Sequence, residues 1–238
     1  MRLDVLLVER RMAKNIKHAT ALILSGVVLV DEQRLDKPGI QVGRTSTIRI
    51  KSDNNQYVSR GGIKLEAALQ NFNIQVEGTV CLDLGASTGG FTDCLLQHGA
   101  RKVYAIDVGS GQLHWNLQRD PRIVVHDSTN ARFLTPSIIN NPVDLIVIDI
   151  AFISLKLIFP RLKLFPSAKI IALVKPQFEA YRNEVGSGGI VRDQRLQRKI
   201  VDRVREHATN KGLVLLNEIP SPLKGRKGNQ EYFLLLKS

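Results

Sequence analysis

Four charged side chains that lie far apart in the chain have the types needed to activate a hydroxyl group. They are Lys64, Asp149, Lys175 and Glu231. A ribose 2′-hydroxyl is a poor nucleophile until its proton is removed or strongly polarised, and a lysine amine can remove that proton only when it is neutral. Desolvation and a neighbouring lysine favour the neutral amine, whereas carboxylates favour the ammonium form and would hold the lysines in place. We therefore predict that Lys175 is the general base or polarising group and that the other three support it.

The elements that must position these residues alternate between strand and helix. Strand-like runs occur at 79–84, 103–108, 123–126, 143–150, 169–175, 212–219 and 232–237. Several of them are nearly continuous aliphatic runs, which are typical of strands buried on both faces. This alternation predicts an α/β fold with a doubly wound, Rossmann-like parallel sheet. Asp149 and Lys175 then fall at the carboxyl ends of strands, where such sheets bind ligands. Glu231 reaches the same edge if the final strand runs antiparallel.

A glycine-rich turn follows the first of these strands and predicts a ligand pocket. The turn matches neither the dinucleotide fingerprint nor the phosphate-binding loop. The aspartate before it would repel phosphates and attract a cation. Acidic residues at successive strand ends suit a nucleoside that lacks phosphates and carries positive charge, and S-adenosyl-L-methionine is such a ligand. We expect its pocket to be formed by Asp83, Gly85, Ala86, Ser87, Thr88, Gly89, Gly90, Phe91, Asp107 and Asp127.

Composition limits the class of protein. The 238 residues include 34 Lys and Arg against 22 Asp and Glu, a formal net charge of +12. That excess favours a polyanionic partner, nucleic acid before a membrane surface. Two cysteines, Cys81 and Cys94, are too few for the disulfide framework of a small secreted protein. They are also too few for a four-ligand zinc site without histidine, so we expect no metal. The N-terminus does not have the pattern of a signal peptide, and the longest largely apolar run is about half of the ~20 residues that span a membrane. We expect a cytoplasmic monomer.

Residues 1–51 have a different pattern and predict a small domain of their own, followed by a polar linker at 52–58 and a larger domain at 59–238. Leu3, Leu6 and Leu7 have helical spacing. A second helix is expected to end at Ser25-Gly26, and strands at 27–30 and 48–50 complete an α+β unit. Basic side chains are concentrated here, which suits contact with phosphates. We predict RNA contacts from Arg2, Arg10, Arg11, Lys14, Lys17 and Arg60.

The first 50 or so residues resemble the S4-type RNA-binding module, also called the α-L domain. The resemblance is carried by Arg2-Leu3-Asp4-Val5-Leu6-Leu7, Gly26-Val27-Val28 and Pro38-Gly39. Over its whole length the chain resembles the TlyA family, often named hemolysin A and regarded as ribosomal-RNA 2′-O-methyltransferases. The motifs are YVSRGGIKL at 57–65, DLGASTGGFTD at 83–93, TNAR at 129–132, FISL at 152–155, VKPQFE at 174–179 and GNQE at 228–231.

The larger domain also resembles the FtsJ-type ribose methyltransferases. Their Lys-Asp-Lys-Glu tetrad corresponds in this sequence to Lys64, Asp149, Lys175 and Glu231. The resemblance implies a class I methyltransferase sheet with S-adenosyl-L-methionine as donor. It also implies ribosomal subunits as partners and the ribose of a cytidine in 16S or 23S ribosomal RNA as acceptor.

Three other functions compete with this one. A membrane-active hemolysin, which the older family name suggests, needs an amphipathic or spanning segment that can enter lipid, and the sequence offers none. A non-catalytic RNA-binding protein with a nucleoside pocket would not need the intact tetrad. A pseudouridine synthase also carries the S4-type module, but it needs a catalytic aspartate in a different fold and no sulfonium pocket. A basic loop with Lys224, Arg226 and Lys227 is either an RNA contact or a solvated loop.

Overall fold

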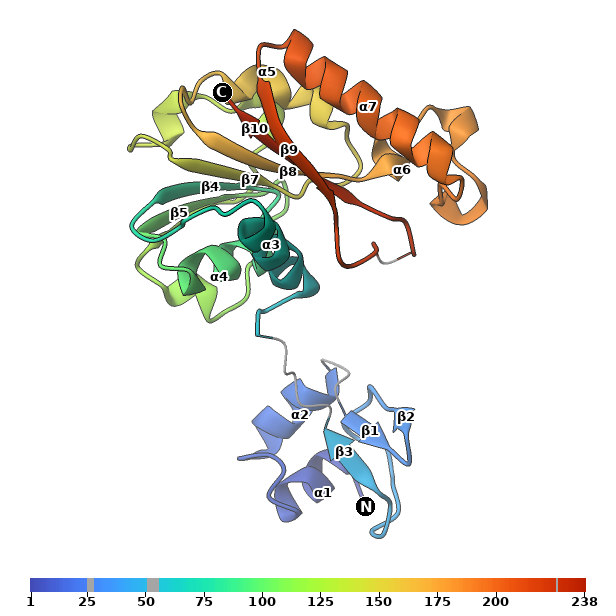
Figure 1. The fold of residues 1–238 in the computed structure, drawn as a ribbon. Helices are drawn as coiled ribbons and strands as arrows, with labels where there is room; N and C mark the ends of the chain where they lie inside the picture. The colour runs from blue at the N-terminus through green and yellow to red at the C-terminus, as the bar shows by residue number, and fades with distance from the viewer. Residues whose placement is uncertain (25–27, 51–55, 226) are drawn as a thin grey trace. The chain divides into compact units, whose positions relative to one another are not determined.

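The computed structural model describes residues 1–24, 28–50, 56–225 and 227–238. The chain divides into two compact units, Met1–Gln56 and Tyr57–Ser238, each of which is described by itself (Figure 1). Several sequence predictions lie outside the described residues: the helix end at Ser25-Gly26, the start of a strand at residue 27, linker residues 52–55, and Arg226 of the basic loop.

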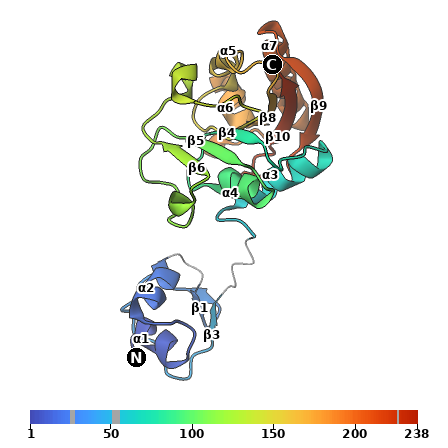
Figure 2. The same ribbon diagram turned by 90° about the vertical axis from the view of Figure 1, so that its left-hand side faces the viewer.

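The first unit packs two helices against a small antiparallel sheet. Its helices are α1 (Leu3–Glu9) and α2 (Ile16–Leu24), and its strands are β1 (Val28–Val30), β2 (Gln33–Arg34) and β3 (Ile48–Ile50), in the order β2-β1-β3 (Figure 1). Figure 2 shows the two helices beside β1 and β3. The apolar positions at helical spacing in α1 and α2 turn inward because only that face can be covered by the sheet. The buried cluster that results includes Leu3, Leu7, Ala19, Ile23 and Val28.

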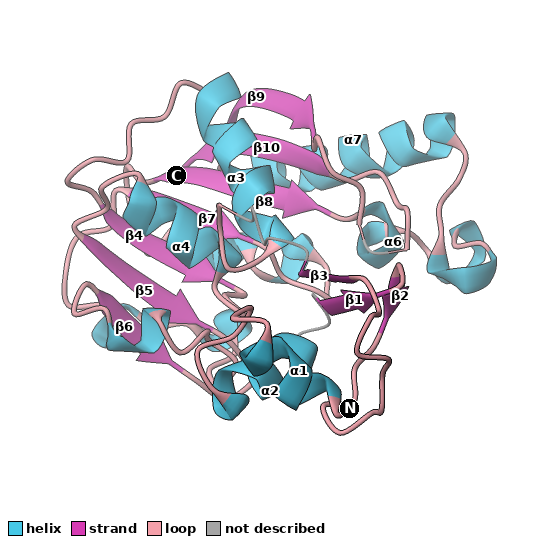
Figure 3. Cartoon of the chain, turned by 90° about the horizontal axis from the view of Figure 1, so that it is seen from below, coloured by secondary structure: helices cyan, strands magenta, loops and turns pink. Residues whose placement is uncertain are grey.

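The second unit is built on a seven-stranded sheet in the order β6-β5-β4-β7-β8-β10-β9 (Figure 3). The strands are β4 (Val80–Leu84), β5 (Lys102–Ile106), β6 (Ile123–His126), β7 (Leu145–Ile148), β8 (Lys169–Val174), β9 (Val214–Pro220) and β10 (Tyr232–Lys237). The pairings from β6 to β8 are parallel, whereas β10 runs antiparallel to both of its neighbours. The predicted doubly wound α/β sheet is therefore confirmed.

Helices cover both faces of this sheet (Figure 1). They are α3 (Arg60–Asn71), α4 (Gly90–Gln97), α5 (Phe159–Leu162), α6 (Pro176–Glu179) and α7 (Gln194–Asn210). Short 3₁₀ turns are η1 (Leu117–Arg119), η2 (Ala131–Phe133), η3 (Pro136–Ile138), η4 (Leu155–Leu157), η5 (Arg182–Glu184) and η6 (Ser187–Gly189). One apolar cluster lies under α3 and α4 and a second under α5 and α7. Alternate strand residues supply the two clusters, which is why the central strands of the sheet are largely aliphatic on both faces.

Two glycines allow α3 to pack closely against its neighbours, Gly90 where it meets α4 and Gly62 where it meets the preceding Tyr57. A Cβ at Gly90 would lie 2.1 Å from Ser59 Oγ, and a Cβ at Gly62 would lie 2.2 Å from the Tyr57 ring. Ser59 also caps α3, because its side chain accepts a hydrogen bond from a backbone N–H in the first turn. The close approach fixes the position of α3, and with it the position of Lys64.

Candidate active site

Asp149 and Lys175 lie side by side at the carboxyl edge of the sheet. Asp149 directly follows β7 and Lys175 directly follows β8, and these two strands are parallel neighbours. Lys175 Nζ lies 2.6 Å from Asp149 Oδ1, and the two side chains are 12% and 24% exposed. The ion pair is thus mostly shielded but still borders solvent, as a group that meets a substrate must.

Lys64 and Glu231 form a second ion pair at the same edge. Lys64 Nζ donates a hydrogen bond of 2.5 Å to Glu231 Oε2, and both residues are buried. The antiparallel register pairs Tyr232 with Val174, which places Glu231 beside Lys175 at the end of β8. The structure therefore brings the four predicted residues to one edge as two adjacent ion pairs.

The glycine-rich turn runs against the backbone of Asp149. Gly85 has a φ of +92°, and a Cβ there would lie 2.8 Å from the carbonyl oxygen of Asp149. Gly89 has a φ of +96°, and a Cβ there would lie 2.3 Å from Leu117 Cδ1. Both positions need glycine for conformation and for space. Of the other predicted residues of this turn, the structure buries Ala86, Gly90 and Phe91 and exposes Ser87 and Thr88.

Asp83 lies fully buried at the end of β4, beneath this turn. Thr92 Oγ1 donates a hydrogen bond of 2.7 Å to Asp83 Oδ2, while Oδ1 is buried and has no hydrogen-bond partner among the described residues. Burial raises the pKa of Asp83 to about 7; the Thr92 hydrogen bond opposes this shift, and the charges of Asp149 and Asp107 add to it. A buried carboxylate with one unused oxygen would be stabilised by a cationic ligand.

Asp107 and Asp127 organise the loop that follows β5. Asp107 accepts hydrogen bonds from the backbone N–H groups of Ser87, at 2.8 Å, and Gly109, at 2.7 Å. Asp127 is exposed and accepts from the Gly111 N–H at 2.8 Å. Because a carboxylate has more lone pairs than these bonds use, both side chains keep capacity to accept hydrogen bonds from a ligand.

The predicted RNA-binding residues fall into two groups. In the first unit, Arg11, Lys14 and Lys17 are exposed. Arg2 instead pairs with Asp4 at 2.7 Å, and Arg10 donates hydrogen bonds to two backbone carbonyl oxygens of the loop before β3.

In the second unit, Arg60 is exposed and its Nη2 donates a hydrogen bond of 2.9 Å to the carbonyl oxygen of Lys224. The arginine that begins α3 is thereby joined to the basic loop that precedes Glu231. Lys224 and Lys227 of that loop are both exposed.

Sequence reasoning missed Phe152 as a site residue. This side chain is 87% exposed, and its backbone φ of +67° is rarely adopted by a bulky residue. Its ring centroid lies 5.3 Å from that of Phe178. The two aromatic residues follow Asp149 and Lys175 by the same interval of three residues, in a chain with only 5% aromatic residues. That repeated spacing was the available signal.

Glu179 was missed as well, and it joins the two loops that carry the first ion pair. It lies buried at the end of α6, where it accepts hydrogen bonds from Ser154 Oγ at 2.5 Å and from the Leu155 N–H at 2.8 Å. Burial raises its pKa. These bonds connect the segment after Lys175 to the turn after Asp149, and they fix the end of the Phe152 loop at Ser154 and Leu155.

Comparison with known proteins agrees with this arrangement. Residues 57–238 match the FtsJ-like methyltransferase family and residues 1–48 match the S4 domain. The chain belongs to the TlyA family of FtsJ-like methyltransferases. The predicted family and the prediction of a methyltransferase are thereby confirmed.

Two relatives are similar over nearly their full lengths. The 16S/23S rRNA (cytidine-2′-O)-methyltransferase TlyA of Mycobacterium tuberculosis H37Rv is 46% identical, over 100% of this chain and 90% of that protein. Hemolysin A of Brachyspira hyodysenteriae is 41% identical over 98% of both chains. Among the described residues, no helix has the length and apolar character needed to cross a membrane.

Solved structures share the fold. A hemolysin-named protein from Streptococcus thermophilus superposes with a TM-score of 0.78 at 38% identity and covers 100% of this chain and 88% of that one. Fibrillarin from Aeropyrum pernix, solved with bound S-adenosyl-L-methionine, has a TM-score of 0.52 over 74% of this chain and 75% of that one. At 15% identity, the fibrillarin likeness concerns the fold alone.

Proposed function

We propose that this protein transfers a methyl group from S-adenosyl-L-methionine to the 2′-hydroxyl of a cytidine in 16S or 23S ribosomal RNA. The proposal rests on one observation: two ion pairs, Lys175–Asp149 and Lys64–Glu231, lie at the carboxyl edge of the sheet next to the glycine-rich turn. The TlyA enzymes to which the chain is similar support the choice of cytidine and of ribosomal RNA. Its partners are then ribosomal subunits, and its place is the cytoplasm.

The residues of the predicted pocket fit this cofactor. S-Adenosyl-L-methionine supplies a methyl group on a positively charged sulfur. The unused oxygen of buried Asp83 suits a cationic ligand. The glycines at positions 85 and 89 let the turn pack against the Asp149 backbone and the Leu117 side chain, and so fix its position above Asp83. We assign the cofactor to Asp83, to the turn of residues 85–91, and to Asp107 and Asp127, whose carboxylates can accept from ribose hydroxyls or the adenine edge.

The tetrad has two tasks in this reaction. Lys175 removes or polarises the proton of the 2′-hydroxyl, and Asp149, which lies 2.6 Å from it, fixes the position of the amine. Lys64 and Glu231 hold the start of β10 beside Lys175 and orient the ribose. No covalent intermediate is needed, so positioning supplies much of the rate.

The test uses the full chain with labelled S-adenosyl-L-methionine and ribosomal subunits that lack the modification, with mass spectrometry to locate the methylated ribose. Lys175→Met should lower the rate roughly 10²- to 10⁴-fold while cofactor binding persists, since general acid–base groups contribute on that order. The matched control is Lys169→Met at the exposed opposite end of β8. Full turnover by Lys175→Met would remove that residue from its role, and absence of a methylated ribose with wild type would refute the activity.

A further inference from the structure

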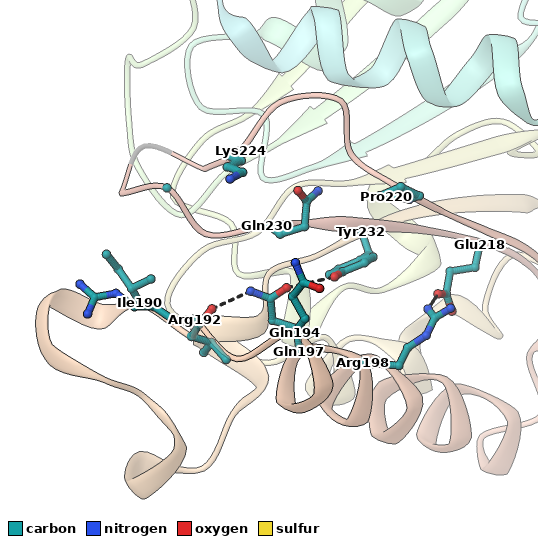
Figure 4. Close-up of a pocket in the computed structure, with 12 residues that line it drawn as sticks. Ile190, Arg192, Gln194, Gln197, Arg198, Glu218, Pro220, Lys224, Gln230 and Tyr232 are labelled. Atoms are coloured by element: carbon teal, nitrogen blue, oxygen red, sulfur yellow. Dashed lines mark hydrogen bonds and ion pairs between the residues drawn. The ribbon is translucent and has the colours of Figure 1, made fainter.

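A pocket of about 570 Å³ lies beside the proposed active site, between the start of α7 and the chain that links β9 to β10 (Figure 4). Ligand pockets in proteins commonly have volumes of roughly 300–1,000 Å³, so this one can hold a nucleotide. None of the cofactor residues assigned above lines it. It is therefore a different site from the one that holds the methyl donor.

Amide side chains make up much of the lining. Gln194, Gln197 and Gln230 line it, and amide groups match the donors and acceptors on the edge of a nucleobase. Gln230 Nε2 donates at 2.9 Å to the carbonyl oxygens of Ser221 and Glu231, so this residue offers its Oε1 as an acceptor. Gln197 is buried and fixed: its Nε2 donates to the carbonyl oxygen of Val191 at 2.7 Å, and the Tyr232 hydroxyl donates to its Oε1 at 3.1 Å (Figure 4). The floor of the pocket is thus a set of oriented hydrogen-bonding groups.

The charges around the pocket favour a phosphate. Three cations line it, Arg192, Arg198 and Lys224, against the single carboxylate of Glu218. Arg198 forms an ion pair with Glu218, so the charges of these two groups neutralise each other (Figure 4). Arg192 and Lys224 are exposed and supply the positive charge that remains. Phosphodiester groups are the usual partners of such side chains in proteins that bind nucleic acids.

The pocket shares a wall with the tetrad. Gln230 directly precedes Glu231, and the carbonyl oxygen of Lys224 accepts the hydrogen bond from Arg60 of α3, the helix that carries Lys64. Asn229, which is buried, braces that wall by bonding at 2.9 Å to both the Val191 N–H and the Gly189 carbonyl oxygen. An RNA strand whose ribose meets Lys175 therefore has a preformed polar site next to it.

We propose that this pocket holds a nucleotide adjacent to the methylated one, with its base among the three glutamines and its phosphate on Arg192 and Lys224. The assignment rests on the proposed function, because it takes the ligand to be the RNA that the tetrad modifies. Its role is to set the register of the strand, so that one chosen ribose stands at the tetrad.

Two kinds of variant test the pocket in the full chain. Gln194→Trp fills the space without changing the charge, and Arg192→Ala/Lys224→Ala removes the cations that would bind the phosphate. The control is Lys211→Ala/Lys237→Ala, a matched removal of two exposed cations at the far ends of α7 and β10. Unmodified ribosomal subunits are the probe. Their Kd is measured at several salt concentrations, alongside KM, kcat and the Kd for S-adenosyl-L-methionine, and thermal unfolding verifies that each variant is folded.

Both pocket variants should raise KM and Kd for the subunits roughly tenfold, which corresponds to about 1.4 kcal/mol, without changing the Kd of the methyl donor. The double-alanine variant should also reduce the salt dependence of binding by about one counterion for each phosphate that it no longer neutralises. Affinities equal to those of the control would overturn the assignment. Tight binding of free cytidine 5′-monophosphate that Gln194→Trp abolishes would also overturn it, by identifying a mononucleotide site. Because the Kd measurements need no methyl transfer, they decide the role of the pocket even if the proposed activity fails.

Discussion

Lys64 Nζ donates a 2.5 Å hydrogen bond to Glu231 Oε2, and this bond joins α3 to the first residue before β10. Only 10% and 3% of the two side chains are exposed, so neither charge is well hydrated. Each is tolerated there because the other neutralises it. The pair consequently has a structural as well as a chemical role: it holds the start of β10 beside Lys175.

Replacing only one residue of this ion pair should lower the free energy of unfolding more than replacing both residues. Lys64→Met leaves an uncompensated buried carboxylate and should lower the free energy of unfolding by about 3 kcal/mol. The double variant Lys64→Met/Glu231→Gln should recover most of that stability without recovering methyl transfer. Urea denaturation and the rate of methyl transfer measure the two effects separately. If the double variant is no more stable than the single one, the pair is not a mutually neutralised unit.

The raised pKa of Asp83, about 7, predicts a pH-dependent affinity for the methyl donor. The carboxylate form becomes populated as the pH rises through 7, and this form attracts the sulfonium cation. The Kd for S-adenosyl-L-methionine should therefore fall between about one pH unit below this pKa and about one unit above it. Asp83→Asn should bind the donor weakly and lose this pH dependence. Calorimetry at several pH values measures it. A Kd that stays constant across this range in wild type would exclude Asp83 as the group that meets the cation.

The same shift predicts how stability varies with pH. A carboxyl group whose pKa is higher in the folded state contributes stability below its unfolded value near 4, and that contribution disappears as pH rises toward 7. Asp83→Asn should therefore become more stable than wild type above pH 7, with the difference shrinking toward pH 4. Asp36→Asn, at an exposed position, is the control and should follow wild type throughout. Thermal unfolding at each pH provides the comparison.

The strands and the residues at their ends could be predicted from the sequence because aliphatic runs mark buried parallel strands, and ligands bind at their carboxyl ends. That reasoning located Asp149 and Lys175 directly. Glu231 needed the additional condition that the last strand be antiparallel, which β10 meets. Lys64 lies on a helix, where no periodicity distinguishes it from a surface lysine. Its inclusion depended on the motif around it.

The remaining features depend on tertiary contacts that no local pattern encodes. The two glycines of the YVSRGGIKL motif look alike in sequence. A Cβ on the second of them, Gly62, would collide with Tyr57 at 2.2 Å, whereas the nearest atom to one on Gly61 is 3.3 Å away. Arg10 has the positive charge of a phosphate ligand, yet its guanidinium donates hydrogen bonds to backbone carbonyl oxygens of the loop before β3. The strained backbone of Phe152 is likewise set by the loop around it.

Phe152 should act as a stacking surface for a base of the RNA, because it is 87% exposed next to the first ion pair. Base–aromatic stacking contributes about 1–3 kcal/mol per base, so Phe152→Ala should raise KM for the RNA roughly tenfold or more. Phe152→Tyr should retain activity. Phe152→Gly should relieve the backbone strain at φ +67°, so its unfolding temperature should be no lower than that of wild type. Its KM for the RNA should nevertheless be as high as that of the alanine variant, because the ring is absent in both.

The control for this prediction is Val214→Ala, at a 58% exposed apolar position at the start of β9. It should change neither KM nor the unfolding temperature. Steady-state kinetics with ribosomal subunits and thermal unfolding supply the data. Equal KM values for Phe152→Ala and wild type would show that the exposed ring does not contact RNA.

The basic residues of the first unit should separate into RNA contacts and structural contacts. Lys14→Ala/Lys17→Ala removes exposed charges, so it should weaken RNA binding and reduce its salt dependence by roughly one counterion for each phosphate left without its cation, with no change in unfolding. Arg10→Ala removes hydrogen bonds to the carbonyl oxygens of Ser46 and Arg44, and should destabilise the unit by about 2 kcal/mol. Salt-dependent binding and chemical denaturation of the full chain distinguish the two effects. If Arg10→Ala instead weakens RNA binding and leaves stability unchanged, its guanidinium is a phosphate ligand, as the sequence predicted.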